Sequence, residues 1–253
     1  GNEAIRYIQD VRKEKTYDDL DEEQLTNECL RYMYRLLFLL YVEARPELGY
    51  APMDSDEYLK GYSVEHLRDL ELMELTTEES KNGFYLHHSL ERLFSLVFHG
   101  YPAVETNGES RTNGQVTADF GEEDEPQHHT FTIEPLRSHL FDPERTPLLS
   151  GVKFRNEVLQ KVIRLMSLSD PDRRDSRERV SYAALGINQL GAVYEALLSY
   201  SGFFAEEDLH EVKEAGESRD PLDVAYFVGE DELDDYAEDE IVFDDDGAPL
   251  VHE

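Results

Sequence analysis

Several residue types are scarce in this chain of 253 residues. It contains one cysteine, Cys29, no tryptophan, and only 7 lysines beside 17 arginines. A single cysteine excludes an internal disulfide, so the sequence favours a reducing, cytoplasmic location. The longest apolar run, residues 36–42, is far shorter than the roughly 20 residues that a helix needs to cross a bilayer. We therefore expect no membrane-spanning helix.

The motifs of common enzyme classes are also missing. The sequence has no Walker phosphate loop, no G-x-G-x-x-G and no G-x-S-x-G. Cys29 stands in an apolar helical segment, which is typical of packing rather than of a nucleophile. Neither adjacent histidine pair, His87-His88 nor His128-His129, has a spacing that chelates one ion on a helix. The acidic runs lack the EF-hand pattern. We expect no catalytic residue, no cofactor site and no metal site in this chain.

Acidic residues dominate what is present. The 57 Asp and Glu residues face 24 Lys and Arg residues, which gives a formal net charge of −33. Such a surface repels phosphate backbones and anionic membranes. The scarcity of lysine favours the proteome of a salt-in halophile, in which salt screens the excess carboxylates. An ordinary acidic protein is the alternative. Over half of the excess lies in residues 203–253, which hold 20 acidic and two basic residues.

One short segment concentrates positive charge. Four arginines fall within seven residues and are a possible phosphate contact: Arg173, Arg174, Arg177 and Arg179. Aspartate and glutamate are interleaved with them, so an exposed loop of mixed charge is the favoured interpretation.

A second weak pattern is typical of metal-dependent nucleases. Glu211 and Lys213 form an E-x-K, and Asp172 lies upstream. Such enzymes place carboxylates on adjoining strands, where they share a metal and activate water. Because Asp172 lies in a loop and the chain is rich in glutamate, we expect no cleavage.

Hydrophobic periodicity predicts a mainly α fold, a multi-helix domain with a few short β-strands, the last of them in the acidic C-terminal segment. Residues 1–202 form the predicted helical domain, with a polar inserted loop at 101–128, and residues 203–253 form a small-β segment. Ser63 is expected to cap one helix, and the 182–200 helix to pack in the core through Gly186 and Gly191. The predicted helices are 3–13, 21–44, 63–73, 86–98, 156–168 and 182–200. The predicted strands are 130–133, 209–212, 224–228 and 241–243, followed by a tight turn at 244–247.

Four segments together resemble one protein family. They are 34–45 (YRLLFLLYVEAR), 62–70 (YSVEHLRDL), 140–147 (LFDPERTP) and 180–198 (VSYAALGINQLGAVYEALL). In this order they are similar to the N-terminal helical or connector region of large adenine-specific DNA methyltransferases. These belong to type IIG and IIL restriction–modification enzymes and to BREX- or DISARM-like phage-defence systems.

The resemblance implies a helical part that scaffolds a catalytic domain. The family's S-adenosylmethionine loop and its [N/D/S]-P-P-[Y/F/W] motif, which holds a flipped adenine, are missing, since the chain contains no Pro-Pro. We therefore expect an inactive fragment of a longer protein. The parent would be an S-adenosylmethionine-dependent DNA methyltransferase specific for adenine N6, with or without a fused restriction endonuclease. The implied partners are its own methyltransferase and target-recognition domains, with DNA bound through the full-length protein.

The high negative charge leaves a different class open. A stand-alone acidic interaction protein, such as a DNA mimic or a defence-complex subunit, would also carry a charge of −33. The two hypotheses differ in whether the reading frame continues past Glu253 into methyltransferase motifs. The sequence does not indicate the DNA site or the oligomeric state.

Overall fold

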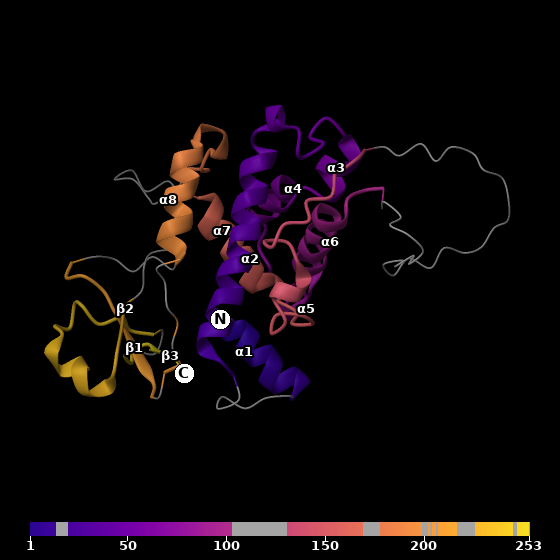
Figure 1. The fold of residues 1–253 in the computed structure, drawn as a ribbon. Coiled ribbons are helices and arrows are strands. Elements are labelled where there is room, and N and C mark those ends of the chain that lie inside the picture. The colour runs from indigo at the N-terminus through magenta and orange to yellow at the C-terminus, as the bar shows by residue number, and fades with distance from the viewer. Residues whose placement is uncertain are drawn as a thin grey trace, which may run out of the picture. The chain divides into compact units, whose positions relative to one another are not determined.

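The fold is described from a computed structural model, and it is mainly helical with a small antiparallel sheet near the C-terminus, which confirms the expected fold class (Figure 1). The structure describes residues 1–13, 20–102, 131–168, 178–198, 202, 204–205, 207–216, 226–244 and 247–252. The polar loop expected at 101–128 lies outside these residues apart from its first two positions.

The described chain forms two compact units, and each is considered by itself. Unit 1 comprises Gly1–Ser167 and Val180–Tyr200, and unit 2 comprises Leu168–Arg179 and Ser201–Glu253. The α-helices, all in unit 1, are α1 (Asn2–Arg6), α2 (Glu22–Glu43), α3 (Asp56–Gly61), α4 (Val64–Asp69), α5 (Glu78–Asn82), α6 (Tyr85–His99), α7 (Asn156–Ser167) and α8 (Ile187–Leu198). The strands, all in unit 2, are β1 (Leu209–Val212), β2 (Tyr226–Val228) and β3 (Val251–His252).

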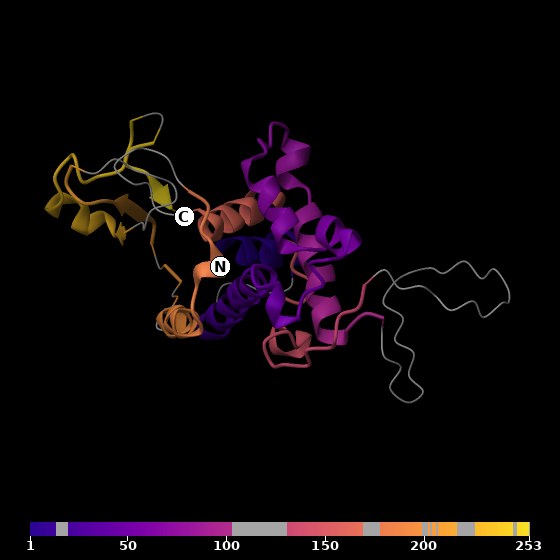
Figure 2. The same cartoon turned by 90° about the horizontal axis from the view of Figure 1, so that it is seen from above.

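Helix α2 is the centre of unit 1. Its N-cap is Asp21, whose side chain accepts a hydrogen bond from the backbone N–H of Gln24 at 2.8 Å, and acidic residues follow in the first turn, where the helix dipole favours them. Seen from above in Figure 2, α6 lies on one side of α2 and α8 on the other. Leu36 and Leu39 are each 1% exposed. The prediction that this segment forms a central core helix is confirmed.

The other predicted helices of the core are present with small shifts at their ends. Ser63 caps α4 by accepting from the backbone N–H of His66 at 3.1 Å, as its sequence position predicts. Helix α6 buries Leu90 and Leu93, and α7 buries Leu159. The N-terminal segment differs in kind: α1 passes at Tyr7–Arg12 into a π-helical turn rather than continuing as an α-helix.

Two predictions in unit 1 are wrong. The strand expected at 130–133 is reduced to one bridge between Tyr101 and Ile133, because Ile133 finds no longer partner segment among the described residues. The helix expected from residue 182 begins at Ile187, after a 3-10 turn at Tyr182–Ala184. It does not pack in the core, and a Cβ placed on Gly191 would meet no atom within 4 Å. Gly191 therefore serves no close approach between helices in unit 1.

Unit 2 contains a three-stranded antiparallel sheet in the order β2-β1-β3. Strand β1 matches the predicted strand residue for residue, and His210 pairs with Val228 on one side and Val251 on the other. The predicted strand at 241–243 is present only as isolated bridges, Val212 with Ile241 and Phe243 with Pro249. The backbone N–H of Gly247 donates to the carbonyl of Asp244 at 3.1 Å, which agrees with the predicted turn.

Two buried tyrosines differ in whether their hydroxyl is satisfied. The Tyr32 hydroxyl is buried and has no hydrogen-bond partner among the described residues, while its ring packs edge-on against Phe94 and Phe154, each at a centroid distance of 5.3 Å. The Tyr58 hydroxyl donates to Glu43 Oε1 at 2.7 Å. An unsatisfied buried hydroxyl carries a desolvation cost that a bonded one recovers.

The two Tyr→Phe substitutions are therefore expected to have opposite effects. Tyr32→Phe should raise the free energy of unfolding by about 1 kcal/mol, because it removes only an unsatisfied group. Tyr58→Phe should lower it by about 1–2 kcal/mol, because it breaks a bond to a buried carboxylate. Urea denaturation of the two variants measures both values. Loss of stability in Tyr32→Phe would show that its hydroxyl has a partner.

Candidate functional site

Two charged residues that α2 buries, Glu28 and Arg35, bind one distant segment, residues 139–149. Glu28 is 3% exposed, and its Oε2 accepts from the backbone N–H of Leu149 at 2.9 Å. Arg35 is 5% exposed; its Nε donates to the carbonyl of Leu140 at 2.7 Å and one Nη donates to the carbonyl of Asp142 at 3.1 Å. Buried charges of this kind are tolerated only when hydrogen bonds satisfy them. The side chains of α2 thus bind chiefly the backbone groups of this segment.

The segment bound by α2 contains a tight turn that its own sequence determines. Pro143 occupies the first position of the 3-10 turn Pro143–Arg145, where its fixed φ and missing N–H are compatible with the turn. The Asp142 carboxylate caps the turn by accepting from the backbone N–H of Glu144 at 3.0 Å. The DPER sequence therefore presents Glu144 and Arg145 beside the first half of α2.

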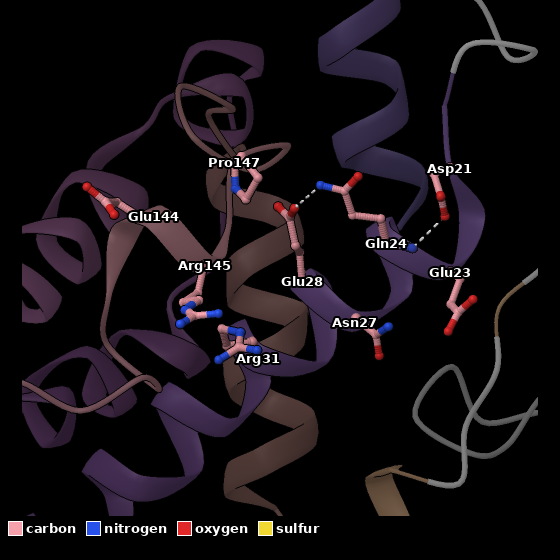
Figure 3. A pocket seen from close by; sticks show the side chains of 9 residues that line it. All are labelled: Asp21, Glu23, Gln24, Asn27, Glu28, Arg31, Glu144, Arg145 and Pro147. Carbon is pink, nitrogen blue, oxygen red and sulfur yellow. Dashed lines mark hydrogen bonds between the residues drawn. The ribbon is translucent and has the colours of Figure 1, made fainter.

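A pocket of about 410 Å³ lies between the N-terminal half of α2 and this turn (Figure 3). Its volume falls in the range of small-molecule sites, but its lining is polar rather than apolar. Its carboxylates are Asp21, Glu23, Glu28 and Glu144. Its remaining polar side chains are Arg31, Arg145, Gln24 and Asn27, and Pro147 completes the wall.

Two of the carboxylates in this pocket are committed to hydrogen bonds within the protein. Asp21 caps α2 through the N–H of Gln24, and Glu28 accepts from Gln24 Nε2 at 2.9 Å as well as from Leu149. Figure 3 shows both contacts of Gln24 as dashed lines. These two carboxylates already accept hydrogen bonds from the protein. The two arginines carry the charged N–H donors that a ligand could meet in this pocket.

The two arginines are weakly engaged. Nη1 of Arg31 donates to the carbonyl of His139 at 2.8 Å, but the guanidinium forms no ion pair within the part of the chain that the structure describes. Its Nε is buried and has no partner there. Arg145 is 54% exposed at its side chain and approaches Asp142 only at 3.8 Å. The arrangement suits non-covalent binding of a group that accepts hydrogen bonds.

A second concentration of buried polar groups joins α2 to α4. Glu43 is 4% exposed; its Oε1 accepts from the Tyr58 hydroxyl and the Val64 N–H, and its Oε2 accepts from the Glu65 N–H at 2.9 Å. Burial raises the pKa of Glu43 to about 7, although the three donors act in the opposite direction. This carboxylate binds the free N–H groups at the start of α4, so its role is structural.

A third polar cluster fixes the N-terminus to α7. Glu3 is 8% exposed and lies between two arginines, with 2.7 Å to Arg6 Nη2 and 2.9 Å to Arg155 Nη2. Burial alone would raise the pKa of Glu3, but hydrogen bonds from the two guanidinium groups outweigh it and lower the pKa to about 2. The cluster is an internal ion-pair network rather than an open site.

Most of the possible phosphate contacts cannot be placed. Arg173, Arg174 and Arg177 lie outside the described residues. Arg179 is exposed, and its backbone forms an isolated bridge with Leu168. The hypothesis of a phosphate contact there stays a prediction. The pocket arginines, Arg31 and Arg145, were not singled out from the sequence, since 114 positions separate them and only the fold brings them to one pocket.

The nuclease pattern is only partly described. Asp172 lies outside the described residues, while Glu211 is 7% exposed on β1 and Lys213 follows that strand. Among the residues that the structure describes, no three or more His, Cys, Asp or Glu side chains gather as metal ligands would. Within the same residues, no helix has the length and apolar character to cross a membrane.

The histidines and the cysteine are placed in part. His87 is 7% exposed on α6 and packs edge-on with Phe154 at 6.0 Å, and burial lowers its pKa to about 4, so it is neutral near pH 7. Cys29 is a free, half-buried thiol on α2. His128 and His129 lie outside the described residues.

Helix α8 exposes several of its apolar side chains. It is attached to α2 where the Tyr34 hydroxyl donates to the carbonyl of Tyr194 at 2.8 Å and the two rings lie 4.6 Å apart. Yet Ile187 is 73% exposed, Tyr194 47% and Val193 38%. In sequence INQLGAVYEALL, Glu195 is the one charged residue. A helix of this composition is unusual on a surface unless another surface covers it.

Comparison with known proteins finds no match for the chain among family models, curated proteins or solved structures.

Proposed function

We propose that this chain is the non-catalytic, scaffolding N-terminal part of a DNA methyltransferase that modifies adenine N6, of the restriction–modification or phage-defence type. The proposal rests on the resemblance of four ordered segments and on the exposed apolar helix that carries the most specific of them, α8. Its implied cofactor, S-adenosylmethionine, and its contact with DNA belong to the other domains of the parent protein.

The positions of the four segments support the proposal. The first lies in α2, and the other three each contact it: α4 through Glu43, the 140–147 turn through Arg35, and α8 through Tyr34. Segments separated by up to about 150 positions thus meet around one helix in unit 1 (Figure 1). If the four segments come from one domain family, they are expected to pack against one another in a common core.

The faces of α8 indicate how it would act. At 100° per residue, Ile187, Leu190, Tyr194 and Leu197 fall on one broad apolar side, with Val193 at its edge, while Asn188 and Glu195 fall on the opposite side. Part of the apolar side meets α2, and the exposed remainder is the surface that we assign to the following methyltransferase domain. In the resembled family this helix immediately precedes that domain, so the two would be neighbours along the chain.

The division of labour predicts opposite results for the fragment and the parent. The 253-residue chain is expected to give no heat of binding with S-adenosylmethionine in calorimetry, whereas the parent protein should methylate DNA. In the parent, Ile187→Glu with Val193→Glu should lower the methylation rate at least tenfold, because two charges enter the proposed contact.

Asn188→Glu is the control, since it adds one of these negative charges to the polar side of α8. It should leave the methylation rate within twofold of the unchanged protein. Thermal melting of the 253-residue chain should be the same for all three forms, which separates loss of docking from loss of folding. Stoichiometric binding of S-adenosylmethionine by the fragment would contradict the proposal.

The exposed carboxylates of unit 2 favour a second candidate, an acidic interaction protein. The 3-10 helix Glu230–Asp235 has the sequence EDELDD, and all of its carboxylate residues are exposed. Such a surface would mimic DNA or bind a basic partner. Sequencing the gene past codon 253 separates the two candidates: methyltransferase motifs in frame support the scaffold, and an immediate stop codon supports the acidic protein.

A further inference from the structure

We propose that the pocket between α2 and the Pro143–Arg145 turn binds a single oxyanion group, a phosphate monoester or a carboxylate of a small ligand, between Arg31 and Arg145. Nothing in the resemblance concerns this pocket, and the inference does not depend on the scaffold proposal.

The first argument is the state of the two guanidinium groups. The chain has more than two carboxylates for each cation, with 57 against 24. Even so, Arg31 forms no ion pair among the described residues, and Arg145 reaches a carboxylate oxygen only at 3.8 Å. A half-buried guanidinium left without a counter-charge in so acidic a chain is poised for an anion from outside. Arginine's planar fork suits bidentate binding of carboxylate and phosphate.

The second argument is that the protein fixes both arginines from the backbone. Arg31 is held by the carbonyl of His139 at 2.8 Å, which leaves its remaining donors free of side-chain partners. Arg145 is the last residue of a turn that Pro143 and the Asp142 cap make rigid. Arg35 fastens that turn to α2 by way of two carbonyls. Because both walls are tied to one helix, the backbone positions that carry the two arginines keep a fixed relation to the pocket.

The third argument concerns the size of the ligand. The pocket measures about 410 Å³, and Asp21, Glu23 and Glu144 also line it. These carboxylates repel the successive charges of a polyanion, so a nucleic-acid backbone is a poor occupant. A single oxyanion meets the two arginines, while Asn27 and Gln24 supply amide groups for a neutral polar part. The chemistry therefore points to a small ligand with one anionic group.

The test is titration of the 253-residue chain with inorganic phosphate, adenosine 5′-monophosphate and acetate, followed by chemical-shift perturbation and calorimetry. We expect saturable binding that shifts resonances of Arg31 and Arg145. Arg145→Ala should weaken binding at least tenfold, because a charge-assisted donor pair is lost. The variant should fold normally, since Arg145 is half exposed and its one ion-pair contact among the described residues is 3.8 Å long.

Arg137→Ala is the matched control. It removes one positive charge from an exposed arginine two residues before the 139–149 segment that does not line the pocket, and binding should be unchanged. Arg31→Lys keeps the charge but loses the fork, and it should also weaken binding.

Tighter binding of the two phosphates identifies a phosphate ligand, and tighter binding of acetate identifies a carboxylate ligand. The proposal is overturned if no probe saturates, if Arg145→Ala binds like the unchanged chain, or if duplex DNA competes at the pocket.

Discussion

Replacing Glu43 by alanine is expected to lower the free energy of unfolding by about 3–5 kcal/mol, because buried donors lose their acceptor. The substitution leaves the Tyr58 hydroxyl and the N–H groups of Val64 and Glu65 without the carboxylate that now accepts from all three. Tyr58 and Val64 are each 1% exposed, so water cannot readily replace the lost carboxylate as acceptor. Urea denaturation monitored by circular dichroism measures the loss.

Glu47→Ala serves as the control for this prediction. Glu47 lies four residues further along, its side chain is 63% exposed, and it pairs with Arg45 at 3.0 Å. An exposed pair of this kind contributes little to stability, because solvent screens it. A Glu43→Ala variant as stable as Glu47→Ala would contradict the role of Glu43 as the cap of α4.

Glu43 and Glu3 are expected to change the free energy of unfolding in opposite directions as the pH rises. The pKa of Glu43 is about 7 in the folded chain, above its ordinary value of 4.5, so the folded state holds the proton more tightly. Its contribution is complete below pH 4.5 and is lost as the pH rises through 7. The pKa of Glu3 is lowered to about 2, so its contribution is present above pH 4.5 and is lost as the pH falls towards 2.

The shift of Glu43 corresponds to about 3 kcal/mol at 1.36 kcal/mol per pKa unit, and solvent screening makes the contribution of Glu3 smaller. The measurement compares the unchanged chain with Glu43→Gln and Glu3→Gln by urea denaturation at pH values from 3 to 8. Glutamine resembles the protonated acid, so each variant should differ least from the unchanged chain at low pH. As the pH rises, Glu43→Gln should become more stable relative to the unchanged chain, and Glu3→Gln should become less stable. Parallel profiles for all three chains would refute the assignment of these shifts.

The central helix could be predicted from its sequence, but its polar contacts could not. Asp21 before an apolar run predicts where α2 begins, and the predicted helix is confirmed. Glu28 and Arg35 look like surface residues in that pattern, yet both are buried. Their partners lie more than 100 positions away, in the 139–149 segment. The prolines of that segment predict a turn, but they do not indicate which helix the turn packs against. The arginine pocket was missed for the same reason.

Helix α8 shows the opposite failure. Its apolar spacing predicts a helix and, by the usual inference, burial. The helix exists, but Ile187 is 73% exposed. Periodicity shows that α8 has an apolar face, but it does not show which surface, within this chain or outside it, buries that face. In unit 1 the ring of Tyr34 covers only one part of that face.

The way in which α2 holds the 139–149 segment sets which positions of that segment can vary in evolution. Arg31 and Arg35 bind the carbonyls of His139, Leu140 and Asp142, and Glu28 binds the N–H of Leu149. Every residue type offers these carbonyls, so the side chain at 139 can drift freely among descendants of this sequence. Pro143 shapes the path of the backbone and cannot. Substitutions should therefore accumulate at position 139, which is exposed, and be rare at Asp142, whose carboxylate caps the turn, and at Pro143.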